Sequence, residues 1–86
     1  MLLYRLKSNL DGSYYQSERT FPGQVTTSEI WASKGKLYHF LICLHVSTLQ
    51  MYNDFYVVER QNTRTETLKR YKITEFFNFF LRENKQ

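Results

Sequence analysis

The stretch EIWASKGKLYHFLICLHV, residues 29–46, decides the fold because it is apolar in almost every direction. It also contains the single Trp, the single Cys and both His of the chain. A segment of this kind can form the core of a small domain, a reactive site or a surface for another protein. The chain around it has 86 residues and an unusual number of aromatic side chains, with 7 Tyr, 7 Phe and 1 Trp.

Residues 34–47 can be interpreted in two ways. Ser33 is a residue type that commonly caps helices, and an apolar stripe follows it at spacings i, i+3, i+4 and i+7, formed by Leu37, Phe40, Leu41 and Leu44. The same residues also alternate as a strand, and Gly35 is unfavourable in a first helical turn. The cap and the length of the segment favour a helix over residues 34–47.

The N-terminal part of the chain has the pattern of a hairpin. Apolar residues alternate from the start, turn residues occupy 9–12 with Asp11 and Gly12 as the strongest signal, and a strand returns over 14–21. Pro22 and Gly23 end that strand, and a third strand is expected within residues 24–32.

Residues 55–73 form a second β region. They are either one long strand that is irregular near Asn62 or a hairpin that turns at 61–64. A competing interpretation starts a helix at Thr63, because Glu66 would complete a capping box, but the apolar spacing favours strands. Thr74 then caps a short helix, EFFNFFLREN.

Together these segments predict an α+β fold in the order β-β-β-α-β-β-α. We expect a small antiparallel sheet of four to five strands, with a central helix and a short C-terminal helix on one face. Residues 1–86 would form one domain, with 84–86 as a frayed tail. A single Cys excludes an internal disulfide, and Arg5 and Lys7 interrupt any apolar leader, which indicates a cytoplasmic protein with no membrane partner.

Catalytic and metal chemistry are not expected. His39 and Cys43 stand four residues apart on a helix, but His45 projects elsewhere and no further Cys or carboxylate completes a ligand set. Cys43 lies between Ile42 and Leu44, which is not the electropositive setting that activates a thiolate. The eight carboxylates are scattered, and no glycine-rich phosphate loop occurs. We therefore expect a protein without a cofactor that is not an enzyme.

A binding surface is the stronger expectation. A helix that is apolar all round must be covered on both sides, and a chain of this size has few elements for the second side. If that side is uncovered, Trp31, Tyr38, Ile42 and Val46 form an exposed patch, which predicts a protein partner or a second copy of the chain. The alternative is that all of these residues belong to the core of a single chain.

The positive charge gives a second binding hypothesis. The net charge is +4, and most of it comes from the second β region, through Arg60, Arg64, Lys69, Arg70 and Lys72. Such a basic strand could follow a phosphate backbone, so the alternative function is a small nucleic-acid-binding module. The same charges on a solvated strand would also discourage edge-to-edge pairing of sheets.

The layout resembles that of small uncharacterised accessory proteins of tailed bacteriophages. The likeness rests on an N-terminal hairpin, then EIWASKGKLYHFL, then the strand YNDFYVVER, and it covers residues 1–73. The C-terminal helix with four Phe departs from it. The resemblance implies no catalytic residues. It implies a phage-encoded protein that works in the host cytoplasm and binds and modulates a bacterial host or defence protein complex.

Overall fold

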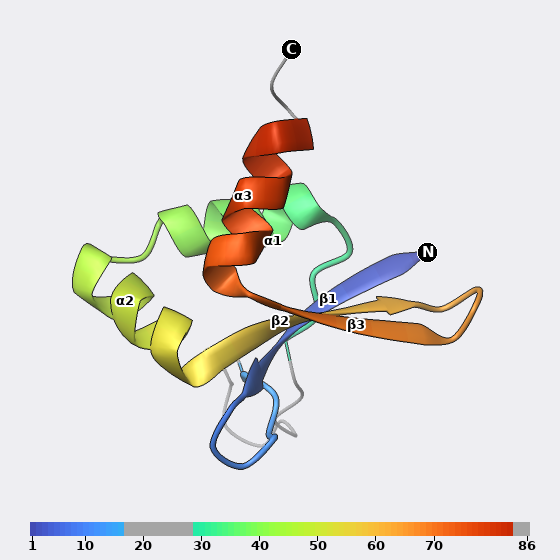
Figure 1. Ribbon diagram of the computed structural model, residues 1–86, viewed down its shortest axis with the longest axis horizontal. Helices are drawn as coiled ribbons and strands as arrows, with labels where there is room; N and C mark the ends of the chain where they lie inside the picture. The colour runs from blue at the N-terminus through green and yellow to red at the C-terminus, as the bar shows by residue number, and fades with distance from the viewer. Residues whose placement is uncertain (17–28, 84–86) are drawn as a thin grey trace, which may run out of the picture.

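The computed structural model describes residues 1–16 and 29–83. Figure 1 shows strand β1 (Leu2–Ser8), helices α1 (Lys34–Ile42) and α2 (Val46–Phe55), strands β2 (Tyr56–Asn62) and β3 (Thr67–Lys72), and helix α3 (Ile73–Glu83). The strands form an antiparallel sheet in the order β1-β2-β3. The α+β class is confirmed. The expected strand number and element order are wrong for the described residues, where the order is β-α-α-β-β-α.

The predicted turn at residues 9–12 is confirmed. The N–H of Gly12 donates to the carbonyl of Ser8 at 3.1 Å, and that of Ser8 donates to the carbonyl of Ser13 at 2.7 Å. Gly12 has a φ of 73°, which glycine adopts without the steric cost that a Cβ atom would add. The chain therefore reverses where the Asp-Gly pair predicts.

The second and third expected strands do not form ladders in the described residues. Tyr14 meets β1 in an isolated bridge with Lys7, and Trp31 meets it in an isolated bridge with Tyr4. Residues 17–28, which contain most of both expected strands, lie outside the described residues. Among the described residues, the two segments therefore pair with β1 at Tyr14 and at Trp31.

The predicted helix over residues 34–47 is interrupted. Ser33 does cap α1, since its Oγ accepts from the N–H of Lys36 at 3.2 Å. The helix then ends early, and His45 caps α2 by accepting the N–H of Ser47 on its Nδ1 at 3.3 Å. The apolar stripe does not reveal this break. His45, which caps the next helix, lies within the predicted range 34–47 but directly after the last residue of the stripe.

The second β region is a hairpin, so one of the two predicted alternatives is right. Its turn occupies residues 63–66 instead of 61–64. Asn62 stabilises the turn by accepting the N–H of Arg64 on its Oδ1 at 3.0 Å, and Glu66 has a φ of 58°. The helix considered from Thr63 does not form.

The C-terminal helix is confirmed, but α3 starts at Ile73, directly after β3. Thr74 is therefore inside the helix and is not its cap. This register buries Ile73 and Phe76. The residues of the expected frayed tail, 84–86, lie outside the described part of the chain.

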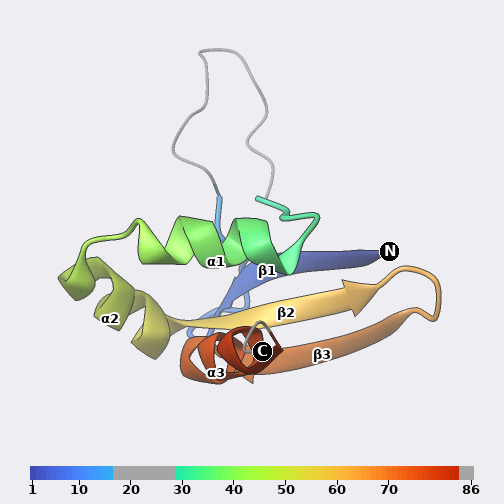
Figure 2. The ribbon, with the colours of Figure 1, turned by 90° about the horizontal axis from the view of Figure 1, so that it is seen from above.

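The core lies between the sheet and two of the helices, α1 and α3 (Figures 1 and 2). Its buried apolar side chains come from β1, β2, α1, α3 and the segment before α1: Tyr4, Leu6, Trp31, Leu37, Leu41, Val58, Ile73 and Phe76. Helix α2 contributes no fully buried residue and lies where β2 begins (Figure 2). Its outer sides are therefore free to form a surface.

Candidate interaction surface

An open groove lies between α2 and the loop that follows β1, with a volume of about 660 Å³. We call it the tyrosine groove. Its lining residues are Ser8, Leu10, Ser13, Tyr14, Tyr15, Gln16, Met51, Tyr52, Phe55 and Tyr56. None of these side chains carries a charge, although the whole chain has a net charge of +4.

The apolar side chains of the groove are open to solvent. Leu10 is 79% exposed, Met51 is 50% exposed and Phe55 is 43% exposed. Tyr, Phe and Met are enriched at the centres of protein–protein interfaces, and charged residues are depleted there. The composition of the groove is therefore that of an interface and differs from that of an ordinary basic surface.

The floor of the groove is built on Tyr15, which holds four other aromatic rings together. Its ring centroid lies 5.7 Å from Phe40, 5.8 Å from Tyr52, 6.0 Å from Tyr56 and 6.3 Å from Trp31. These distances lie within the range in which aromatic pairs attract beyond simple burial. The groove thus rests on the core, which keeps its floor rigid.

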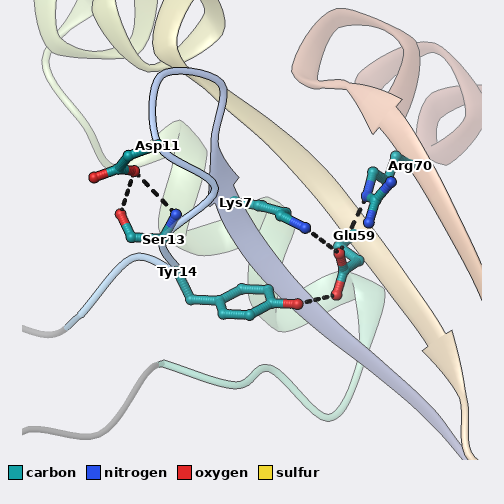
Figure 3. A network of polar contacts seen from close by, with 6 residues as sticks. All are labelled: Lys7, Asp11, Ser13, Tyr14, Glu59 and Arg70. Atoms are coloured by element: carbon teal, nitrogen blue, oxygen red, sulfur yellow. Dashed lines mark hydrogen bonds and ion pairs between the residues drawn. The ribbon is translucent and has the colours of Figure 1, made fainter.

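The loop wall of the groove is held by local hydrogen bonds (Figure 3). One carboxylate oxygen of Asp11 accepts from the backbone N–H of Ser13 at 2.9 Å and from its hydroxyl at 2.7 Å. These bonds to Ser13 lower the pKa of the Asp11 carboxyl below its ordinary value. The N–H of Asn9 donates to the carbonyl of Phe55 at 2.8 Å, which ties the loop to the end of α2.

A buried carboxylate fixes the far side of the same loop (Figure 3). The Tyr14 hydroxyl donates to Oε1 of Glu59 at 2.7 Å, and this bond raises the pKa of Tyr14. Oε2 of Glu59 meets Arg70 Nε at 3.3 Å and Lys7 Nζ at 3.9 Å. Glu59 is only 2% exposed, and its negative charge is neutralised by two cations, Lys7 of β1 and Arg70 of β3. The wall therefore needs little ordering when a ligand binds.

The predicted partner-binding residues are not brought together. Trp31 is 7% exposed and lies in the core, so the expectation that it contacts a partner is withdrawn. Tyr38 is half-buried, with its ring stacked on Phe80 of α3 at 4.1 Å. Ile42 and Val46 are exposed, at 50% and 68%, but neither lines the tyrosine groove.

The predicted basic residues are divided between both faces of the hairpin. Arg60 and Lys69 are register partners, so they share the face that the helices cover. Arg70 and Lys72 are two residues apart in β3, so both lie on the opposite face of the hairpin. Arg64 lies in the turn, so the five cations do not form one track.

The residues considered for metal or thiol chemistry lie apart from the groove. Cys43 is exposed, and its Sγ lies 3.6 Å from Nε2 of His39. His45 acts as a helix cap. Within residues 1–16 and 29–83 there is no group of three or more His, Cys, Asp or Glu that could hold a metal. In the same ranges, no helix has the length and apolar character needed to cross a membrane.

Sequence reasoning missed the groove because it did not recognise α2. Met51 and Phe55 are spaced i and i+4 on that helix, which is a signal for one exposed apolar face once the helix is known. Leu10 is contributed by a turn, and no periodicity links it to Met51 and Phe55, which are 41 and 45 positions away. Only the folded chain brings these three side chains to one groove.

Comparisons of the chain with models of protein families, with curated proteins and with solved structures found no match. The fold and the groove define its class in physical terms. It is a small α+β protein with a rigid, uncharged and tyrosine-rich groove beside a peripheral helix.

Proposed function

We propose that this chain is a non-catalytic interaction protein that binds another protein through the tyrosine groove. The observation that carries the proposal is the absence of charge from the groove lining together with three exposed apolar side chains, Leu10, Met51 and Phe55. Interface centres have this composition. The fixed loop wall also favours binding, since little conformational entropy is lost there.

The occupant that fits is an uncharged segment of a partner protein. Its apolar side chains would lie on Met51 and Phe55, and its backbone would meet the hydroxyl groups of the tyrosines, which offer both an apolar ring and a polar tip. Nucleic acid fits this groove poorly, because its affinity depends on neutralising phosphates with Lys and Arg. Neither residue occurs among the described side chains that line the groove.

The biological setting of the proposal comes from the likeness to phage accessory proteins. On that basis the partner is a bacterial host or defence protein complex, and binding takes place in the host cytoplasm. Cys43, unpaired and exposed, suits a reducing compartment.

Paired double variants test the groove. We expect Met51→Ser with Phe55→Ser to lose a partner that the unchanged chain retains from bacterial lysate. The control is Leu68→Ser with Leu81→Ser, which replaces two side chains of similar exposure, 51% and 54%, outside the groove. The partner is identified by mass spectrometry and purified. The groove variant should then bind about tenfold or more weakly, which corresponds to about 1.4 kcal/mol.

Two further controls make the result decisive. Circular dichroism must show that both double variants are folded, and nuclease treatment of the lysate must leave the capture unchanged. Equal binding by the two double variants would refute the groove as the site. A dimer of the pure protein that the groove variant disperses would instead assign the groove to a second copy of the chain.

A further inference from the structure

A second hollow lies on the face of the sheet that the helices cover, away from the tyrosine groove. It is about 230 Å³ in volume, opens to solvent, and lies between α3 and the sheet. Aromatic rings form most of its walls, from Tyr4, Tyr71, Phe76, Phe79 and Phe80. We call it the arginine cavity, because the side chain of Arg60 also lines it.

Arg60 lacks an acidic partner in the part of the chain that the structure describes. The ion pairs found there join Lys7 and Arg70 to Glu59, and Lys34 to Glu83. The guanidinium of Arg60 instead lies over the ring of Tyr71, 5.6 Å from its centroid. A guanidinium is planar and presents its N–H groups as a fork, from which a carboxylate can accept two hydrogen bonds.

The charges around the cavity leave one unmatched cation. Lys34 and Glu83 line it as well, and they neutralise each other. A neighbouring hollow of about 320 Å³ borders the arginine cavity. The two share the lining residues Tyr4, Lys34, Arg60 and Glu83, so Arg60 is bordered by open space on two sides. Burial raises the pKa of Tyr4, and the neighbouring Arg60 opposes that rise.

We propose that the arginine cavity binds a monocarboxylate attached to one flat apolar ring. The carboxylate accepts two hydrogen bonds from Arg60, and the ring lies among Phe76, Phe79 and Tyr71. A single negative charge matches the single unpaired cation, whereas a phosphate dianion would exceed it. The volume is below the roughly 300–1,000 Å³ of pockets for drug-sized ligands, which suits one ring and its acid group. This site is separate from the tyrosine groove and does not depend on the proposed function.

Three small probes test separately the contributions of the ring and of the negative charge to binding. Phenylacetate carries both the ring and the charge, phenylacetamide carries the ring alone, and acetate carries the charge alone. We expect saturable chemical-shift changes in cavity residues with phenylacetate and binding about tenfold or more weaker with either of the other two. Equal binding of phenylacetate and phenylacetamide would overturn the proposal, and so would the absence of saturation with phenylacetate.

Variants of Arg60 test the same site independently. Arg60→Gln should lose the preference for acid over amide, and Arg60→Lys should keep only part of it because an ammonium is a point charge. Arg64→Gln removes an exposed cation from the hairpin turn and should bind like the unchanged chain. An unchanged preference in Arg60→Gln would refute the assignment. If Arg60→Gln fails to fold, the comparison of the three probes on the unchanged chain still decides.

A peptide distinguishes two natural sources of a ring with a carboxylate, the C-terminus of a protein chain and a free small acid. The tripeptide Gly-Gly-Phe presents both groups at its C-terminus, and its C-terminal amide lacks the charge. Binding of the free-acid peptide, but not of its amide, supports the site as a receptor for a chain terminus. Binding of phenylacetate but not of the peptide supports the site as one for a free small acid.

Discussion

At the scale of single residues, Tyr14 illustrates how one polar contact organises a surface. Its hydroxyl donates to a carboxylate that is almost fully buried, and its ring is flanked by two cations, with Arg5 at 5.0 Å and Lys7 at 5.7 Å from the centroid. The local sequence predicts that Tyr14 follows a turn and begins a strand, but it does not predict the partner of its hydroxyl. Its partner, Glu59, is 45 positions away, and the contact exists only in the folded chain.

We expect Tyr14→Phe to lower the free energy of unfolding by about 1 kcal/mol at neutral pH, because a hydrogen bond to a charged acceptor is lost. The effect should depend on pH. The pKa of Tyr14 is raised above its ordinary value of 10.0, chiefly by the bond to Glu59. Its stabilising contribution is therefore complete below about pH 10 and is lost as pH rises through the folded-state pKa.

Urea unfolding at neutral and alkaline pH measures this contribution. The gap in stability between the unchanged chain and Tyr14→Phe should shrink above about pH 10. Tyr38→Phe, in which the ring packs on α3, serves as the control and should retain the alkaline loss of stability. A constant gap across the pH range would show that the hydroxyl contact does not stabilise the folded state.

At the scale of elements, local chemistry predicted the presence of several segments better than their ends. Ser33 was recognised as a cap, but the second cap at His45 was not, since His is an uncommon capping residue. The hairpin was one of two predicted alternatives for residues 55–73. Its turn lies later than predicted because Glu66 takes a conformation that its residue type does not signal.

The turn of the β2–β3 hairpin provides a test at this scale. Glu66 has a φ of 58°, and the left-handed region costs a non-glycine residue roughly 1–2 kcal/mol. Replacing Glu66 by glycine removes this cost, but part of the gain in stability is offset by the greater conformational freedom of glycine in the unfolded chain. We expect Glu66→Gly to stabilise the protein by about 0.5–1 kcal/mol, measured from the urea midpoint.

The matched control is Glu75→Gly, in the first turn of α3. Glycine in a helix costs about 1 kcal/mol, so the same substitution should destabilise the protein there. Two changes of the same kind are thus expected to have opposite signs. A loss of stability in both variants would contradict the assigned geometry of the hairpin turn.

At the scale of the whole molecule, Tyr15 connects parts of the chain that are distant in sequence. Its ring contacts Trp31, Phe40 of α1, Tyr52 of α2 and Tyr56 of β2. This cluster joins the loop after β1 to both helices and forms the floor of the tyrosine groove. The stability of the fold and the proposed binding surface therefore depend on one set of aromatic contacts.

We expect Tyr15→Ala to destabilise the fold by about 3 kcal/mol, the lower end of the range for removing a packed aromatic side chain, since Tyr15 is half-buried. Tyr15→Phe keeps the ring contacts and should cost much less. Leu10→Ala is the control, because Leu10 is 79% exposed and its loss should change stability by less than about 0.5 kcal/mol. Chemical unfolding followed by Trp31 fluorescence measures all three. Equal effects of Tyr15→Ala and Leu10→Ala would show that the cluster does not support the fold.

The sequence by itself determined the α+β class, the turn at residues 9–12, the cap at Ser33 and the C-terminal helix. Each of these depends on the residue types and spacings within a few neighbouring positions, which a linear pattern contains. Only the tertiary structure decided which aromatic side chains are covered. It buried Trp31 and exposed Met51 and Phe55, because exposure depends on contacts between segments far apart in the chain. It also separated Arg60 from Arg70, since Arg70 follows Lys69, the register partner of Arg60, and successive residues of a strand point to opposite faces of the sheet.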